Sequence, residues 1–398
     1  MPHINKIKFQ NIIIMKTCRF RILIITNCIA ILGTGCVSNN KHMNDANDSD
    51  GVFYHYQWEL DTNCVIPRGE SNTIDNRVAG DPCIVWDKSI NTWRMFYFGG
   101  GTDEEGNYVT TGMAIAKSAE NIAPGDWTKI GEINISNPED IMDPRMAHKW
   151  WVVMEAHQFN RAAVIEGKYW SLFTCTVNNN KHIQAAWAEK LAGPWNVLSK
   201  PILSPDENFL DGKHCDTPTA YWFPDSNRVV IFYKAYPKYP QKNQAGSEYG
   251  SGTVLAYWNL KDSVANKIRV MQRPGQMEGW NQGWMSTPQI FYNPKEDFWY
   301  GLINGSPTPP EDESHREPAP SLGGWVRSKT NEKNSEWIPM NEYSPLKYPS
   351  DLTKEEQHAG LGTNFWRHHL LVTPEDKARI FFNSGFYGKE QMYSWKVK

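Results

Sequence analysis

Short apolar runs separated by turns recur along the chain from residue 53 to the C-terminus, with no long amphipathic helical stretch between them. Each copy of the pattern holds an apolar run, a turn, a second run rich in aromatic residues and a third run with small residues, and most copies close near a Trp. Five copies can be traced, beginning at DPCIVWD (81–87), RAAVIEGKYWSLFTC (161–175), DTPTAYWFPDSNRVVIFYKAY (216–236), STPQIFYNPKEDFWYGLING (286–305) and GTNFWRHHLLVTPEDKARIFFNSG (362–385).

The five copies predict an all-β chain folded as a five-bladed β-propeller. Each copy would form one antiparallel sheet of about four strands, and radial stacking would bury the faces that an isolated sheet leaves uncovered. We expect the run FYHYQWEL (53–60) to supply a strand that closes the ring against the last blade. The alternative is a β-sandwich of similar length, which the fivefold recurrence disfavours.

Composition fits this fold and narrows the classes of function. The chain has 398 residues, of which 40% are hydrophobic, enough for a real core. Its 18 Trp, 17 Tyr and 16 Phe favour strands and supply faces that stack on sugar rings. Its 41 Lys and Arg against 44 Asp and Glu leave a net charge of −3, so we expect no nucleic-acid partner, which would require a concentrated basic face.

The first 36 residues have the features of a targeting signal. From Met15 the chain shows a basic start, an apolar run over 22–32 and small residues before Cys36, as in a short secretory signal. The ending LGTGC resembles a bacterial lipoprotein box, which would make Cys36 a lipid anchor and the only contact with a membrane; a cleaved signal without lipid is the alternative. Residues 37–52 are a polar linker, and 53–398 form the propeller domain. We therefore expect an exported protein, in the periplasm or outer membrane of a bacterium.

Four cysteines besides Cys36 follow the signal segment. They are scattered and show no CxxC spacing, so we expect buried free thiols or at most one disulfide, and no structural zinc. The four are Cys64, Cys83, Cys175 and Cys215.

Two segments in the repeats show a more specific resemblance to a known group of proteins. AIAKSAENIAPGDWTKI (114–130) and QAAWAEKLAGPWNVLSKPILSP (184–205) resemble the blade strands of five-bladed glycoside hydrolases of families 43 and 32 and their relatives. These relatives include family 117, which acts on anhydrogalactose-capped agar oligosaccharides. The resemblance spans most of residues 75–385 and implies an oligosaccharide substrate held in a funnel at the starts of the innermost strands.

Hydrolysis of a glycosidic bond needs two carboxyl groups facing across it. The best match to the family 43 pattern is Asp81, in the Asp-Pro at the start of the first blade, where the resemblance implies the general base. The alternative is an Asp that caps a turn before Pro82.

The third blade offers Asp216, where family 43 has a Glu-Gly-Pro that supplies the general acid and this chain has Asp-Thr-Pro. Asp216 is therefore either the acid or a helper that tunes the pKa of another group. His214 would face the same pocket if the strand is regular, and we count it as a substrate-binding candidate.

In the second blade the family's Asp-Pro is missing and Asn160 and Arg161 stand near its place, with His157 just upstream. Arg161 would bind an anionic or heavily hydroxylated sugar, or alternatively form a salt bridge at the blade mouth. We include His157 and Arg161 among the substrate-binding candidates.

Later in the chain, Glu278 is a third catalytic candidate, which the resemblance to family 117 supports. Trp280 and Trp284 beside it would suit a sugar platform. His358 would contact sugar or hold a structural cation on the propeller axis. The pair of adjacent His at 368 and 369 alternates faces, and no metalloprotease, phosphate-loop or nucleophile-elbow motif occurs, so we expect no catalytic metal and no required cofactor.

Together these features predict an exported glycoside hydrolase, exo-acting and inverting, that cleaves plant or algal oligosaccharides. The first alternative is a surface propeller that binds glycans without catalysis. The second is a family 117-like enzyme that releases 3,6-anhydro-L-galactose.

Overall fold

The computed structural model of the chain describes most of the residues beyond position 52. The described residues are 53–239, 241–242, 248–249, 251–272, 280–281, 284–306, 321–329, 337–362, 364–375, 377–386 and 388–398. The expected signal segment, Cys36 and the linker over 37–52 lie outside them.

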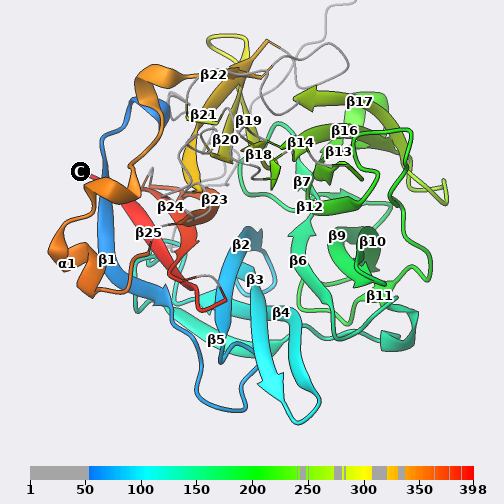
Figure 1. The fold of residues 1–398 in the computed structure, drawn as a ribbon, viewed down its shortest axis with the longest axis horizontal. Helices are drawn as coiled ribbons and strands as arrows, with labels where there is room; N and C mark the ends of the chain where they lie inside the picture. Colours follow the sequence, from blue (N-terminus) through cyan, green and yellow to red (C-terminus); the bar gives the residue numbers. More distant parts are fainter. Residues whose placement is uncertain are drawn as a thin grey trace, which may run out of the picture. The chain divides into compact units, whose positions relative to one another are not determined.

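Nearly all of the regular secondary structure in the described chain is β-strand, and the strands form five blades (Figure 1). The blades, each written from its innermost strand, are β2 (Val78–Asp87), β3 (Thr92–Asp103), β4 (Gly106–Ala116) and β5 (Trp127–Glu132); β6 (Ala147–Val152), β9 (Lys168–Val177), β10 (Asn180–Ala188) and β11 (Asn196–Val197); β12 (His214–Phe223), β13 (Arg228–Tyr236), β16 (Gly252–Trp258) and β17 (Asn266–Gln272); β18 (Trp284–Met285) with β19 (Gln289–Asn293), β20 (Phe298–Ser306), β21 (Leu322–Ser328) and β22 (Ile338–Pro339); and β23 (Phe365–Val372), β24 (Ala378–Ser384), β25 (Gln391–Val397) and β1 (Trp58–Ile66).

Short elements connect and flank the blades. They are the strands β7 (Met154–Glu155), β8 (Val164–Ile165), β14 (Gln241–Lys242) and β15 (Glu248–Tyr249), the 3-10 turns at Phe53–His55, Pro138–Asp140, Pro224–Ser226, Asn341–Tyr343 and Pro349–Asp351, and the helix α1 (Lys354–His358). No helix within the described ranges is long and apolar enough to cross a membrane.

The predicted closure of the ring is confirmed. Strand β1 pairs antiparallel with β25, the last strand of the chain, with Trp58 opposite Val397. The closing strand begins later than predicted, because Phe53–His55 form a 3-10 turn whose first two residues are buried. Figure 1 shows β1 at the outer edge of the last blade, where the N-terminal strand and the last three strands complete one sheet.

One predicted boundary was wrong. We took the second copy of the repeat to begin at residue 161, but the innermost strand of the second blade is β6, which lies before it. The short run that we read as the first strand is β8, a hairpin partner of β9. The run over 147–152 escaped notice because its charged Lys149 interrupts the apolar pattern.

A polar node joins three blades in the middle of the core. Asn160, in the loop after β7, is 2% exposed and lies with its Nδ2 2.9 Å from His369 Nε2, 3.1 Å from the Ile84 carbonyl oxygen and 3.1 Å from the Leu370 carbonyl oxygen. Its own carbonyl accepts a hydrogen bond from the Trp86 N–H at 2.9 Å. A buried amide with these partners ties β2 to β23 through a loop of the second blade, and this is a structural role.

Replacing this amide should destabilise the protein. Asn160→Ala leaves buried partners without a hydrogen bond, so we expect a loss of about 2–4 kcal/mol in the free energy of unfolding, measured by chemical denaturation. The matched control is Asn227→Ala, because Asn227 is exposed and shares the left-handed backbone, with φ of 50° against 49°. Equal losses in the two variants would show that the backbone, and not the node, sets the cost.

Candidate active site

The innermost strands of four blades share one irregularity. Each has a shift of pairing register after its first residues, as in a β-bulge. At each shift one residue other than Gly takes a left-handed backbone: Asp81 with φ of 47°, Lys149 with 59°, Thr217 with 51° and Arg367 with 44°. Such conformations are costly for these residue types, and bulges redirect side chains. The repetition brings polar side chains together at one level of the inner strands.

Asp216 is the centre of this group. It is fully buried, and its carboxylate accepts hydrogen bonds from Lys149 Nζ at 3.0 and 3.1 Å, from Lys181 Nζ at 2.6 Å and from Thr174 Oγ1 at 3.1 Å. Lys149 comes from β6 of the neighbouring blade, and Lys181 from the start of β10. Two ammonium groups therefore hold one carboxylate across the junction between the second and third blades.

This pairing decides what Asp216 can do. Burial alone would raise the pKa of Asp216, but the charges of Lys149 and Lys181 outweigh it and hold the pKa well below its usual range. A carboxyl that stays ionised has no proton to give. Of the two roles that we considered for Asp216, the geometry favours the helper over the general acid.

Asp81 lies on the bulge of β2 and is 9% exposed. Its backbone N–H donates to Asn383 Oδ1 at 3.1 Å, which fixes the strand at this point. Within the described part of the chain its carboxylate has no hydrogen bond and no ion pair. Asp81 nevertheless interacts electrostatically with Lys149 and Arg367, so it belongs to the same group.

Arg367 and Lys234 complete a set of charged side chains that we call the axial cluster: Asp81, Lys149, Lys181, Asp216, Lys234 and Arg367. Arg367 is 7% exposed, donates from Nη2 to the Pro218 carbonyl oxygen at 2.9 Å and lies over the Trp151 ring. Lys234 stands opposite Asp216 on β13, and burial lowers its pKa to about 7. His148, next to Lys149, is buried and its pKa falls to about 3, so it is neutral.

His214 lies close to the axial cluster, and its role in substrate binding stays a prediction. Its Nδ1 accepts the Lys181 backbone N–H at 3.2 Å, and its ring contacts Tyr236 edge-on. Partial burial, followed by the charge of Lys181, lowers the pKa of His214 to about 4. The imidazole is therefore neutral at pH 7 and is a hydrogen-bonding group and not a cation.

His157 and Arg161 lie elsewhere, which corrects our placement of them. His157 packs its ring against Phe223 at 5.9 Å and Trp299 at 5.4 Å, and Phe223 ends β12, seven residues beyond Asp216. At about 3.3 Å a residue, this is roughly 20 Å along the strand. Arg161 pairs with Glu155 at 3.3 Å, in agreement with the salt-bridge alternative.

The remaining candidates divide between the core, the surface and the part that is not described. Trp280 is 3% exposed and packs in the core against Gly305 and Gly324, so it presents no open face for a sugar. His358 ends α1, an exposed helix beside β1 and β25 at the periphery and not at the axis (Figure 1). Glu278 and the side chain of Trp284 lie outside the described residues, and their roles stay predictions.

Another buried carboxyl borders the first blade. Glu390, just before β25, is 6% exposed and accepts the Ala79 N–H at its carbonyl, two residues before Asp81. Burial raises the pKa of Glu390, and the charge of Asp81 adds to the effect. A carboxyl with a raised pKa, such as Glu390, is the kind of group that can act as a general acid on a sugar.

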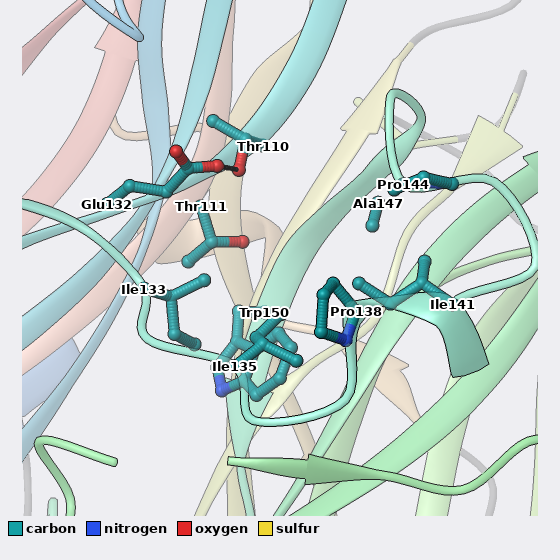
Figure 2. A pocket seen from close by; sticks show the side chains of 10 residues that line it. All are labelled: Thr110, Thr111, Glu132, Ile133, Ile135, Pro138, Ile141, Pro144, Ala147 and Trp150. Carbon is teal, nitrogen blue, oxygen red and sulfur yellow. Dashed lines mark hydrogen bonds between the residues drawn. The ribbon is translucent and has the colours of Figure 1, made fainter. Parts of the chain in front are cut away.

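A cavity of about 230 Å³ opens between the first two blades, beside the strand that carries Lys149 (Figure 2). Trp150 closes one side of it, and Glu132, hydrogen bonded to Thr110, is the one carboxylate on its wall. It lacks a second carboxyl, so we do not place catalysis there.

The described residues contain no group of three His, Cys, Asp or Glu side chains that would hold a metal ion. The structural cation therefore stays a prediction. Cys64, Cys83, Cys175 and Cys215 are free thiols, in agreement with the sequence.

Sequence reasoning missed Lys149, Lys181, Lys234 and Arg367. A signal was present for two of them: HKWW (148–151) and WRHH (366–369) place a charged residue just ahead of an apolar run, as GDPC (80–83) does with Asp81. We searched these positions for carboxylates and so passed over the cations.

No family model and no curated relative matches this chain. Solved structures do match in fold. One, from the GH130 family of mannoside phosphorylases that contains glycoside hydrolases targeting β-1,2 mannosidic linkages in Candida mannan, has 13% identity and a TM-score of 0.55 over 85% of this chain and 93% of its own. A glycosyl hydrolase from Bacteroides ovatus has 12% identity and a TM-score of 0.54 over 85% and 92%. A thermostable family 43 glycoside hydrolase has 12% identity and a TM-score of 0.50 over 83% and 92%. The fold is that of the five-bladed β-propeller glycoside hydrolases.

The ion pairs of Asp216 give a pH-dependent prediction. Because folding lowers the pKa of Asp216, the pairs stabilise the protein above the unfolded pKa of about 4, and this stability is lost as the pH falls toward the folded pKa. Asp216→Asn should lower the free energy of unfolding by about 3–5 kcal/mol at pH 7, with a smaller difference from wild type below pH 4. Urea denaturation across this pH range measures it, with the exposed Asp225→Asn as control. A difference that does not shrink in acid would contradict the ion-paired state.

Proposed function

We propose that this protein is a glycoside hydrolase and that Asp81 is its catalytic base. The observation that carries the proposal is the repeated left-handed bulge, which brings Asp81 together with charged side chains of three neighbouring strands in a fold shared with glycoside hydrolases. Asp81 is the carboxylate of this group that is left without a hydrogen bond among the described residues, so it is available to a water molecule.

In this scheme Asp81 accepts a proton from the attacking water while a second carboxyl protonates the leaving oxygen. Asp216 stays ionised, and it orients Lys149 and Lys181. The proton donor is Glu278, as the sequence predicts, or Glu390, whose raised pKa suits the task. A Glu390→Gln variant with full activity at every pH would leave Glu278 as the donor.

The finer points rest on the sequence. We propose an exported enzyme, lipid-anchored through Cys36, that removes single units from the end of a plant or algal oligosaccharide with inversion. Release of 3,6-anhydro-L-galactose from agar oligosaccharides is one outcome that a substrate screen would reveal.

A glycan-binding propeller without catalysis is the second candidate. The state of Asp216 favours it, because a carboxyl locked between two ammonium groups removes one expected proton donor from the described site. Binding of an oligosaccharide with no detectable turnover would identify this function.

The proposal predicts the effect of one substitution. Asp81→Asn should lower the rate of sugar release by about 100-fold or more, because a general base contributes about 10² to 10⁴ in rate. Asn tolerates the left-handed backbone at this position, so the fold should be retained. Mass spectrometry of products from arabino-, xylo-, fructo-, galacto- and agar-derived oligosaccharides gives the rate, and a melting curve checks the fold. An Asp81→Asn protein as active as the exposed control Asp225→Asn would remove Asp81 from the mechanism.

A further inference from the structure

The axial cluster carries more positive than negative charge. Among the described residues, Lys149, Lys181 and Arg367 are three cations against the two carboxylates of Asp81 and Asp216, so the formal excess is one positive charge. Lys234 is left out of this balance, because burial lowers its pKa to about 7. Gathering like charges in a partly buried place is costly unless an anion balances them. A neutral sugar, which offers only hydroxyl groups, leaves this excess unbalanced.

Arg367 points to the same missing partner. Its side chain is more than nine-tenths buried, and its Nη1 is a buried donor without a hydrogen-bond acceptor among the described residues. Its Nη2 is already used by the Pro218 carbonyl, and its charge is felt by both Asp81 and Asp216. A guanidinium with an unused N–H on one edge matches an oxyanion in shape and charge.

The two lysines that hold Asp216 are reachable from solvent. The side chain of Lys149 is 18% exposed and that of Lys181 is 25% exposed, although their carboxylate partner is fully buried. An ammonium group has three protons to donate, and Lys181 Nζ spends one on Asp216. Further protons of Lys181 are therefore available to an acceptor that approaches from the open side.

Two histidines beside the axial cluster are neutral at pH 7. Burial lowers the pKa of His148 to about 3 and that of His214 to about 4, so neither adds charge. Tyr236 lies 5.9 Å from Lys181 Nζ and 5.0 Å from Lys234 Nζ, measured to the ring centroid, and offers a face to both cations. Among the described residues, these two histidines therefore neither add to nor offset the charge of the axial cluster.

We propose that the axial cluster binds the oxyanion of an acidic sugar, a carboxylate or a sulfate carried on the ring. Lys149, Lys181 and Arg367 contact the anion, and Asp81 stands at the side where the sugar ring continues. The inference rests on the proposed function for the presence of a sugar and deepens it by assigning the substrate to acidic glycans.

The test is a binding experiment with monosaccharides, which contain no bond to cleave. Titration calorimetry on the full-length chain compares D-galacturonate, D-glucuronate and D-galactose 6-sulfate with D-galactose and D-glucose, and adds inorganic sulfate and phosphate. We expect at least one acidic sugar to bind tenfold or more tightly than its neutral counterpart. We also expect its affinity to fall severalfold between 50 and 300 mM salt, while that of the neutral sugar stays constant.

Two variants place the anion. Lys181→Met and Arg367→Gln should each abolish the preference for the acidic sugar, because each weakens binding of the acidic sugar more than binding of the neutral one. Lys190→Met is the matched control, since Lys190 follows the other end of β10 and is exposed. Should Lys181→Met fail to fold because Asp216 loses a partner, Arg367→Gln and the salt dependence of the wild type still decide the question.

Other results would overturn the proposal. Equal affinity for acidic and neutral sugars would mean that the protein has no site for the anion of a sugar. A preference that is unchanged in both variants would mean that the anion binds outside the axial cluster. Inorganic sulfate or phosphate binding as tightly as every acidic sugar would mean an inorganic anion site. Because no glycosidic bond is involved, an inactive protein that still prefers acidic sugars would refute the hydrolase and leave the anion site standing.

Discussion

A bulge with a left-handed residue in the innermost strand of four blades is the constraint on which the site depends. A regular strand would alternate its side chains, and a fully buried inner strand has no place for charge on either face. At the bulge the backbone of Asp81, Lys149 or Arg367 leaves that alternation, so a charged side chain can turn away from the apolar contacts of its neighbours. The strain at each bulge is held by the sheet around it, and by bonds such as that from the Asp81 N–H to Asn383.

The two carboxylates of the axial cluster have different roles in this arrangement. Asp216, enclosed and neutralised by Lys149 and Lys181, holds the second and third blades at a fixed distance and orients cations. Asp81 keeps a carboxylate without such partners among the described residues. The chemistry of the site is therefore asymmetric, with one carboxylate committed to structure and one open to a ligand.

The sequence predicted the architecture because the fivefold recurrence of apolar runs is a long-range pattern that single charged residues do not hide. It also singled out Asp81, where the Asp-Pro match and the strand start coincide, and the structure places this residue in the axial cluster, while its role as a base stays a proposal. It could not predict the role of Asp216, because Lys181 reaches it from a strand more than thirty residues away in the chain. His358 was placed at the axis although Thr353 and Glu356 form a capping box that starts a short helix at the periphery. Trp280 was read as a platform because an aromatic side chain in a loop looks the same in sequence whether it is open or buried.

The central claim is that charged side chains from the bulges meet at one site and hold an acidic ligand there. A crystal structure of the full chain with bound D-galacturonate tests this most directly. The account predicts the sugar carboxylate within hydrogen-bond distance of Arg367 Nη1 and of an ammonium group of Lys149 or Lys181, with Asp216 still paired to both lysines. Galacturonate bound away from these side chains, or a separation of Asp216 from its lysines, would contradict it.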